Sequence, residues 1–169
     1  ANVLGTYQRF LPISASAAAD CARLLRLPGD RLSVIHVPVR GRADESADPG
    51  VARRFGVEAG YVVTVTGYNP RKNIAGTLAA YAGLPRALRE RHQLVMVCQL
   101  QEAERTEITD LARGLGVADR VVLTGHVTDA ELDALVSCAD TALFLSHYEG
   151  FGIPAAEALA AGVPLVCSN

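Results

Sequence analysis

The sequence predicts an α/β protein built on a doubly wound parallel sheet, and two observations support this prediction. From residue 61 onwards, short and nearly continuous apolar runs recur, which is typical of strands buried on both faces. Segments of helical length separate these runs, as expected when helices cover both faces of a parallel sheet. The expected strands are Tyr61–Thr66, Leu94–Cys98, Val121–Thr124, Thr141–Leu145 and Pro164–Cys167, and the expected helices are Asn73–Leu84, Ala103–Leu115, Asp129–Cys138 and Pro154–Ala161.

Local signals mark the ends of two of these helices. Thr128 and Glu131 form a capping-box pattern immediately before the third helix. Pro154 stands where the fourth helix should begin, Gly162 follows its expected last residue, and Pro164 prevents continuation. The fourth helix is therefore expected to start at Pro154.

The first fifty residues follow a different pattern. Ser14 or Ser16 can cap a helix that runs to about Leu27, and the apolar alternation of Leu32–Val39 predicts a strand. Residues 40–50 are rich in Gly, Asp, Ser and Pro and predict a loop or linker. We therefore expect a small N-terminal remnant over 1–50, ahead of the sheet domain over 51–169.

Composition excludes several classes of function. A net charge of −2 gives no support for nucleic-acid binding. No apolar run approaches the roughly 20 residues needed to span a bilayer, and no signal-peptide pattern opens the chain, so a cytoplasmic protein is expected. The four cysteines form no CxxC pair and are expected to be mainly buried, reduced side chains and not metal ligands: Cys21, Cys98, Cys138 and Cys167.

Two loops that are distant in sequence are expected to meet at one edge of the sheet. In a doubly wound sheet of the usual order, the first and fourth strands are neighbours, and ligands bind outside their carboxyl ends. Arg71 and Lys72 follow the first strand, and Glu149 to Gly152 follow the fourth. Lys72 is the only lysine in the chain, and a compact ammonium is a common partner of phosphate.

The loop after the fourth strand has the features of an anion site. Gly150 and Gly152 permit a tight turn and close approach of a ligand to the backbone. The N-terminus of the following helix offers unpaired N–H groups and the positive end of its dipole. Glu149 and Glu157 are expected to border the same small volume, so the predicted ligand carries hydroxyl groups as well as phosphate.

These motifs resemble those of a known enzyme family. Glu149-Gly-Phe-Gly-Ile-Pro154, the second glutamate at position 157 and the Pro70-Arg-Lys-Asn73 loop are similar to the signatures of retaining glycosyltransferases of the GT-B fold, family four. The resemblance implies that 51–169 is the Rossmann-like, C-terminal half of that fold, truncated at its end. It also implies that 1–50 is the tail of a preceding acceptor domain.

The resemblance also implies a role for each motif residue. Lys72 would bind the donor diphosphate, Glu149 the hydroxyls of the donor sugar, and Glu157 the nucleotide ribose. Tyr68 occupies a position that is commonly arginine in the family, so Arg71 is either its substitute or an ordinary loop charge. The remaining donor-binding candidates are Gly150, Phe151, Gly152, Ile153 and Ser146, with Gly125, His126 and Val127 expected beside the base.

The implied activity is transfer of a sugar from a nucleotide-diphosphate donor without a metal or other cofactor. GDP-mannose is favoured over UDP-sugars, and the acceptor would be a saccharide or a lipid-linked molecule held by the preceding domain, with peripheral membrane association open. Two alternatives remain: an isolated sugar-nucleotide-binding module without turnover, and a GT-B-like epimerase. A dinucleotide dehydrogenase is disfavoured because Gly67 to Lys72 lacks the G-x-G-x-x-G turn.

Overall fold

A computed structural model describes residues 3–39, 48, 50–58 and 60–168. The chain divides into two compact units. The first, here called the N-terminal unit, combines Ala1–Val39 with Glu149–Ile153. The second, the sheet unit, combines Arg40–Tyr148 with Pro154–Asn169. The expected domain boundary at residue 50 stays a prediction.

The N-terminal unit contains one α-helix among its described residues. This helix, α1 (Ala15–Leu25), begins after Ser14, whose hydroxyl accepts a hydrogen bond from the Ala17 amide, as the sequence predicts. Two short 3-10 helices, η1 (Val3–Thr6) and η2 (Gly29–Arg31), lie on either side. The expected strand over Leu32–Val39 is wrong, because only Leu32 pairs, in a single parallel bridge with Phe10.

The sheet unit holds five parallel strands in the order β3-β2-β1-β4-β5, so the expected doubly wound sheet is confirmed. The strands are β1 (Gly60–Val65), β2 (His92–Val97), β3 (Val121–Leu123), β4 (Thr141–Phe144) and β5 (Leu165–Cys167). β1 lies between β2 and β4, with Val62 in register with Leu94 on one side and Thr141 on the other. The strand order reverses at β1 and β4, as anticipated.

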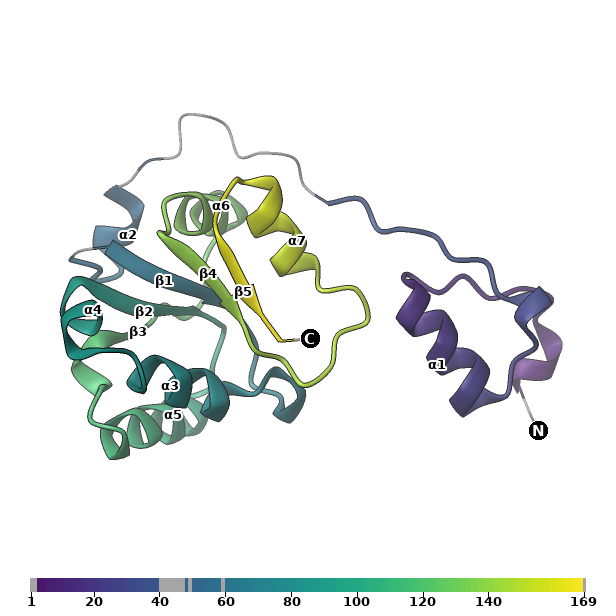
Figure 1. Cartoon of the computed structure of the whole chain (residues 1–169), viewed down its shortest axis with the longest axis horizontal. Helices are drawn as coiled ribbons and strands as arrows, with labels where there is room; N and C mark the ends of the chain where they lie inside the picture. The colour runs from purple at the N-terminus through teal and green to yellow at the C-terminus, as the bar shows by residue number, and fades with distance from the viewer. Residues whose placement is uncertain (1–2, 40–47, 49, 59, 169) are drawn as a thin grey trace. The chain divides into compact units, whose positions relative to one another are not determined.

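Helices cover both faces of this sheet (Figure 1). The helices after β1 and β2, α3 and α5, lie on one face, and α6 and α7 lie on the other. This division follows from right-handed crossovers that run in opposite directions from the central strand. The helices are α2 (Gly50–Arg54), α3 (Ile74–Ala82), α4 (Arg86–Arg91), α5 (Glu102–Gly114), α6 (Asp129–Ser137) and α7 (Ile153–Ala160). The 3-10 helices are η3 (Pro70–Lys72) and η4 (Ala118–Arg120).

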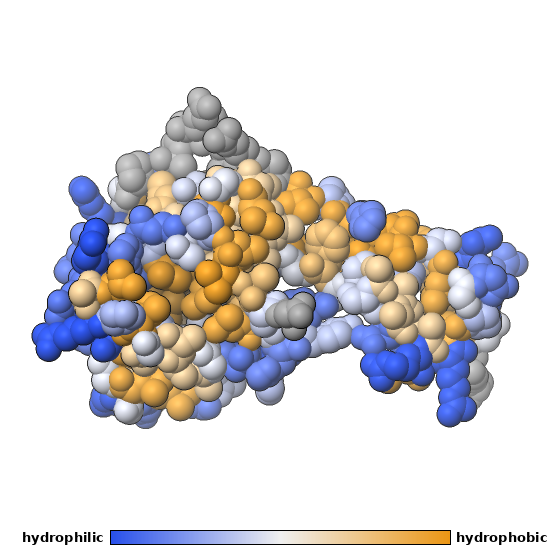
Figure 2. Space-filling view, viewed as in Figure 1, coloured by the Kyte–Doolittle hydropathy of each residue, from blue (hydrophilic) through white to orange (hydrophobic). Residues whose placement is uncertain are grey.

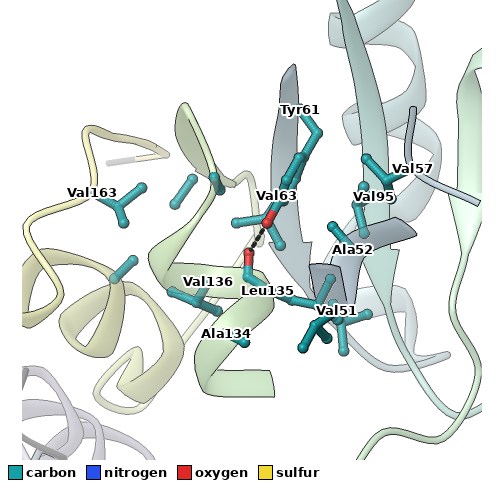
Figure 3. Close-up of a cluster of buried hydrophobic side chains, with 14 residues drawn as sticks. Val51, Ala52, Val57, Tyr61, Val63, Val95, Ala134, Leu135, Val136 and Val163 are labelled. Atoms are coloured by element: carbon teal, nitrogen blue, oxygen red, sulfur yellow. Dashed lines mark hydrogen bonds between the residues drawn. The ribbon is translucent and has the colours of Figure 1, made fainter. Parts of the chain in front are cut away.

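Alternation along β2 builds one core on each face. Leu94 and Met96 point to the α3 and α5 side, whereas Val95 and Val97 belong to the opposite cluster, and all four are buried. Figure 3 shows the second cluster, in which the Tyr61 hydroxyl donates a 2.8 Å hydrogen bond to the Leu135 carbonyl. Burial raises the pKa of Tyr61 well above its ordinary value, with Cys138 and Asp140 adding to the effect.

Candidate functional site

The loop after β1 is a short, internally bonded turn. Asn69 caps η3 by accepting a 2.9 Å hydrogen bond from the Arg71 amide, and the Lys72 amide donates to the Asn69 carbonyl at 2.9 Å. The side chain of Lys72, the last residue of η3, is half-buried. Lys72 is therefore held on an ordered turn at the carboxyl end of a central strand.

Asn73 is the residue that joins this turn to the rest of the sheet edge. Its backbone lies in the left-handed region, at φ +52°, and its side chain caps α3 by accepting from the Gly76 amide at 3.1 Å. The same side chain donates to the Leu145 carbonyl at 2.9 Å, just beyond β4. The sequence placed Asn73 as the first residue of a helix, and its cap and long-range bond were not anticipated.

Arg71 makes two more connections between the same loops. Its carbonyl accepts from the His147 amide at 2.8 Å, and its guanidinium donates to the Tyr148 carbonyl at 2.8 Å. With the Asn73–Leu145 bond, three hydrogen bonds thus connect the loop after β1 to residues 145–148. The expected convergence of these two loops is confirmed up to Tyr148.

Tyr68, at the position where the resemblance implies an arginine, is engaged elsewhere. Its hydroxyl donates a short hydrogen bond to the Glu107 carboxylate on α5, and this bond raises the pKa of Tyr68 above its ordinary value. The Arg71 guanidinium donates to the Tyr148 carbonyl in the neighbouring loop, and its role as a substitute stays a prediction.

The motif loop Glu149–Ile153 groups with the N-terminal unit, where its contacts come from residues that no motif marked. The Ser14 hydroxyl donates a short hydrogen bond to the Gly150 carbonyl. The rings of His36 and Phe151 lie 6.4 Å apart, tilted by 56°. Ser14 was expected only as a helix cap, and His36 has no surrounding motif.

The glycine and proline signals around α7 are mostly confirmed. Gly152 and Gly162 adopt positive φ, at +80° and +76°, which explains glycine before and after this helix. The helix begins at Ile153, so Pro154 is its second residue and not its first. Proline is tolerated there because the first-turn amides have no intrahelical partner. Glu157 follows within the helix and is half-buried.

Ser146 and the loop after β3 complete the set of predicted residues. The Ser146 carbonyl accepts from the Ser168 hydroxyl at 2.5 Å. In the loop after β3, Gly125 adopts φ +76°, His126 is exposed, and Val127 packs against the core. The loop ends at the predicted Thr128 capping box, which is confirmed.

Glu131, near the start of α6 and close in sequence to His126, has a lowered pKa. The pKa of Glu131 is lowered by hydrogen bonds from the Thr128 amide and hydroxyl, with Arg54 and His126 contributing less. The Thr128 cap therefore favours the ionised form of the Glu131 carboxylate at the start of α6.

A separate apolar hollow of about 390 Å³ lies on one face of the sheet, next to the end of β4. Its lining includes Tyr81 and Leu84 on the α3 side and Leu143, Leu145 and Val166 from β4, its end and β5. Figure 2 shows apolar surface over the part of the sheet unit where β4 and β5 lie. This hollow has neither Lys72 nor Glu157 in its lining, so we do not assign the candidate site to it.

The burial of the cysteines differs in part from the prediction. All four are free, and only Cys98 is buried, whereas Cys21 and Cys138 are half-buried and Cys167 is exposed on the edge strand β5. Among the described residues no group of three or more His, Cys, Asp or Glu side chains has the arrangement of a metal site. No helix in the described ranges is both long and apolar enough to cross a bilayer.

Comparison with known proteins identifies the family. The model of the glycosyl transferases group 1 matches residues 53–169. The chain belongs to this family. Two curated relatives from Escherichia coli match nearly the whole chain: the serotype-specific mannosyltransferase WbdA at 29% identity and the O-antigen chain mannosyltransferase B at 31%. The matches cover 99% and 98% of this chain but only 22% and 44% of those proteins.

Solved structures share the fold of this group 1 glycosyl transferase chain. WaaG, a glycosyltransferase involved in lipopolysaccharide biosynthesis, superposes with a TM-score of 0.79 at 21% identity, over 93% of this chain and 43% of WaaG. Anabaena HepE in complex with UDP and glucose gives a TM-score of 0.77 at 19% identity, over 95% and 44%. The GT-B resemblance and the fold class are therefore confirmed.

Proposed function

We propose that this chain is the donor-binding part of a retaining glycosyltransferase that uses a nucleotide-diphosphate sugar. The observation that carries the proposal is the set of three hydrogen bonds between residues 71–73 and residues 145–148. These bonds hold the turn bearing Lys72 beside the loop that continues into Glu149. The position matches the general rule that ligands of doubly wound sheets bind outside the carboxyl ends at the switch point.

Lys72 would stabilise the departing diphosphate. Transfer of the sugar leaves increasing negative charge on the diphosphate, and a cation fixed in advance beside that charge lowers the barrier. Arg71 would hold the loop through the Tyr148 carbonyl and add positive charge. The proposed chemistry requires no metal or other cofactor.

The two motif carboxylates would bind the hydroxyl groups of the donor. An ionised carboxylate accepts hydrogen bonds only, and adjacent hydroxyls of a sugar are suitable donors. In the proposal Glu149 accepts from the transferred sugar and Glu157 from the ribose. Backbone amides of Gly150 to Ile153 would contact the diphosphate, Ser146 would flank them, and Gly125, His126 and Val127 would border the base.

We favour GDP-mannose as the donor, with UDP-sugars as the competing choice. Two of the curated relatives are mannosyltransferases, whereas the HepE structure was solved with UDP and glucose. This chain spans less than half of the length of these relatives. In the proposal, a saccharide or lipid-linked acceptor is bound by a region that corresponds to the unmatched part of the relatives. Peripheral membrane association of the whole protein belongs to the same proposal.

Calorimetric titration of this chain with GDP, UDP, ADP and their sugars tests the proposed binding. Lys72→Ala should weaken the preferred nucleotide about 10- to 100-fold, because a hydrogen bond to a charged group contributes about 1.5–3 kcal/mol. Glu157→Ala should weaken it by a similar factor. Arg113→Ala is a matched control, because Arg113 is exposed and pairs with Asp110 on α5. Nucleotide binding that survives both site substitutions would refute the proposed site.

A binding module without turnover is the second candidate, since the chain spans only 22% of WbdA. We expect this chain alone to bind donor weakly and to transfer nothing. Sugar transfer with retention at the anomeric carbon by the whole gene product would support the transferase. Tight nucleotide binding with no transfer to saccharide or lipid-linked acceptors would favour the module.

A further inference from the structure

Two hydrogen bonds hold the first residue of the loop after β3, Thr124–Val127. The Thr124 amide donates to the Met96 carbonyl at 3.2 Å, and the Thr124 hydroxyl donates to the Gly125 carbonyl at 3.0 Å. Gly125 then turns the chain at φ +76°. Glycine adopts positive φ about as readily as negative φ. The backbone preference of Gly125 therefore does not determine the shape of the turn.

Arg105 supplies a contact that limits this freedom. It lies near the start of α5, is half-buried, and donates from Nη1 to the Leu123 carbonyl at 3.1 Å. Leu123 is the last residue of β3, which lies at the edge of the sheet. The other terminal nitrogen, Nη2, lies 3.4 Å from the position that a Cβ on Gly125 would occupy. One guanidinium thus bonds to the end of the strand and lies beside the turn that follows.

Arg105 lies beside a small hollow between α5 and β3. A cavity of about 150 Å³ separates α5 from β3 here, with Arg105, Ile108, Thr109, Val121 and Leu123 in its lining. Ile108 and Ala112 of α5 pack in the same cluster as Val121 and Leu123, so the polar contact of Arg105 adds to apolar packing here. A planar guanidinium with several fixed donors holds the Leu123 carbonyl in place better than a single rotatable group would.

We infer that Arg105 is a positioning residue that holds loop Thr124–Val127 in the shape that receives the nucleotide base, an inference that rests on the proposed function. A base read by backbone N–H and C=O groups requires those groups to point in fixed directions. Arg105 does not contact the nucleotide in this account. It acts through the Leu123 carbonyl and Gly125, and its effect falls on the base and not on the diphosphate.

Calorimetry on this chain with GDP, UDP, ADP and inorganic pyrophosphate tests the inference. Arg105→Met keeps the apolar stem but loses the donors, so affinity for the preferred nucleotide should fall about three- to tenfold, as for one lost hydrogen bond. Selectivity among the three bases should decrease, and pyrophosphate affinity should stay the same. Arg105→Lys should restore part of the loss, because an ammonium can still donate to the Leu123 carbonyl.

Arg120→Met is the matched control. Arg120 also donates to backbone carbonyls, those of Arg89 and Glu90, but it lies before β3 and away from the loop. It should destabilise the fold without changing base selectivity. The inference is overturned if Arg105→Met binds nucleotides like the wild type, loses pyrophosphate affinity in parallel, or behaves like Arg120→Met. If the wild type binds none of the nucleotides, the proposed function fails and the inference fails with it.

Discussion

Replacing Asn73 with alanine should be the most damaging single change in the loop after β1. The substitution removes the cap on the Gly76 amide and the bond to the Leu145 carbonyl. It also places alanine at φ +52°, in the left-handed region. Asparagine is tolerated there because its side chain makes local hydrogen bonds, which alanine cannot make. Three separate contributions to stability are therefore lost at one position.

The three losses can be estimated individually. Loss of a side-chain cap costs about 1 kcal/mol. Loss of a partly buried hydrogen bond to a carbonyl costs about 1 kcal/mol. Alanine in the left-handed region costs about 1 kcal/mol more. The free energy of unfolding should thus fall by about 3 kcal/mol for Asn73→Ala. It should fall by only about 1–1.5 kcal/mol for Asn73→Gly, because glycine caps almost as well and enters this region freely.

Urea unfolding followed by far-UV circular dichroism measures both variants against the wild type. The difference between the alanine and glycine variants isolates the backbone contribution, and the glycine variant alone reports the bond to Leu145. The same pair should be titrated with nucleotide, because Lys72 precedes Asn73 directly. Equal destabilisation by alanine and glycine would refute the backbone contribution. A change under 0.5 kcal/mol for the glycine variant, a size typical of surface substitutions, would refute the assignment of Asn73 as the connector of the two loops.

Three further predictions test other parts of the sheet unit. Tyr61→Phe should lower the free energy of unfolding by about 1 kcal/mol, because it leaves a buried carbonyl in α6 without its partner; urea unfolding that shows no change would contradict this. Gly76→Ala should destabilise, since the new Cβ would lie 2.4 Å from Asn73 side-chain atoms, whereas helix propensity alone predicts a gain of about 1 kcal/mol. Iodoacetamide at pH 8 should modify exposed Cys167 first and Cys98 last, because burial raises the pKa of Cys98 to about 11 and keeps its thiol protonated. Peptide mass spectrometry measures the order of modification, and the reverse order would refute this prediction.

The raised pKa of Cys98 also sets the sign of a pH effect. The unfolded chain releases this proton near the ordinary value of 9.0, whereas the folded chain retains it to about 11. The contribution to stability is therefore complete below pH 9 and is lost as the pH rises towards 11. Cys98→Ala should reduce this dependence, and unfolding curves between pH 8 and 11 measure it.

Much of the sheet unit was predictable because its signals are local. A run such as Leu94–Cys98 is apolar at every position, and a strand buried on both faces needs nothing else to be recognised. Capping at Thr128 and the glycine at 162 were visible for the same reason. The usual order of a doubly wound sheet was an assumption, and with it the loops after β1 and β4 are predicted to meet.

The failures occur where structure depends on a distant partner or on a weak pattern. Residues 32–39 have the alternation of a strand, yet a strand forms only when another strand pairs with it, and Phe10 offers a single bridge. Helix α4, Arg86–Arg91, has no apolar periodicity and only six residues, so it gave no signal beyond Pro85 before it. The bond from Asn73 to Leu145 spans 72 positions, and no local motif announces it.

The motif loop shows how this limit affects function. Glu149 to Ile153 is read from sequence as one unit with the helix that follows, because the motif is continuous. In the structure its described partners are Ser14, which donates to the Gly150 carbonyl, and His36, whose ring lies near Phe151. The orientation of the amides proposed to hold the diphosphate therefore depends on residues more than one hundred positions earlier. A motif specifies the chemical groups of a donor site, but the direction in which they point is set by side chains that the motif does not contain.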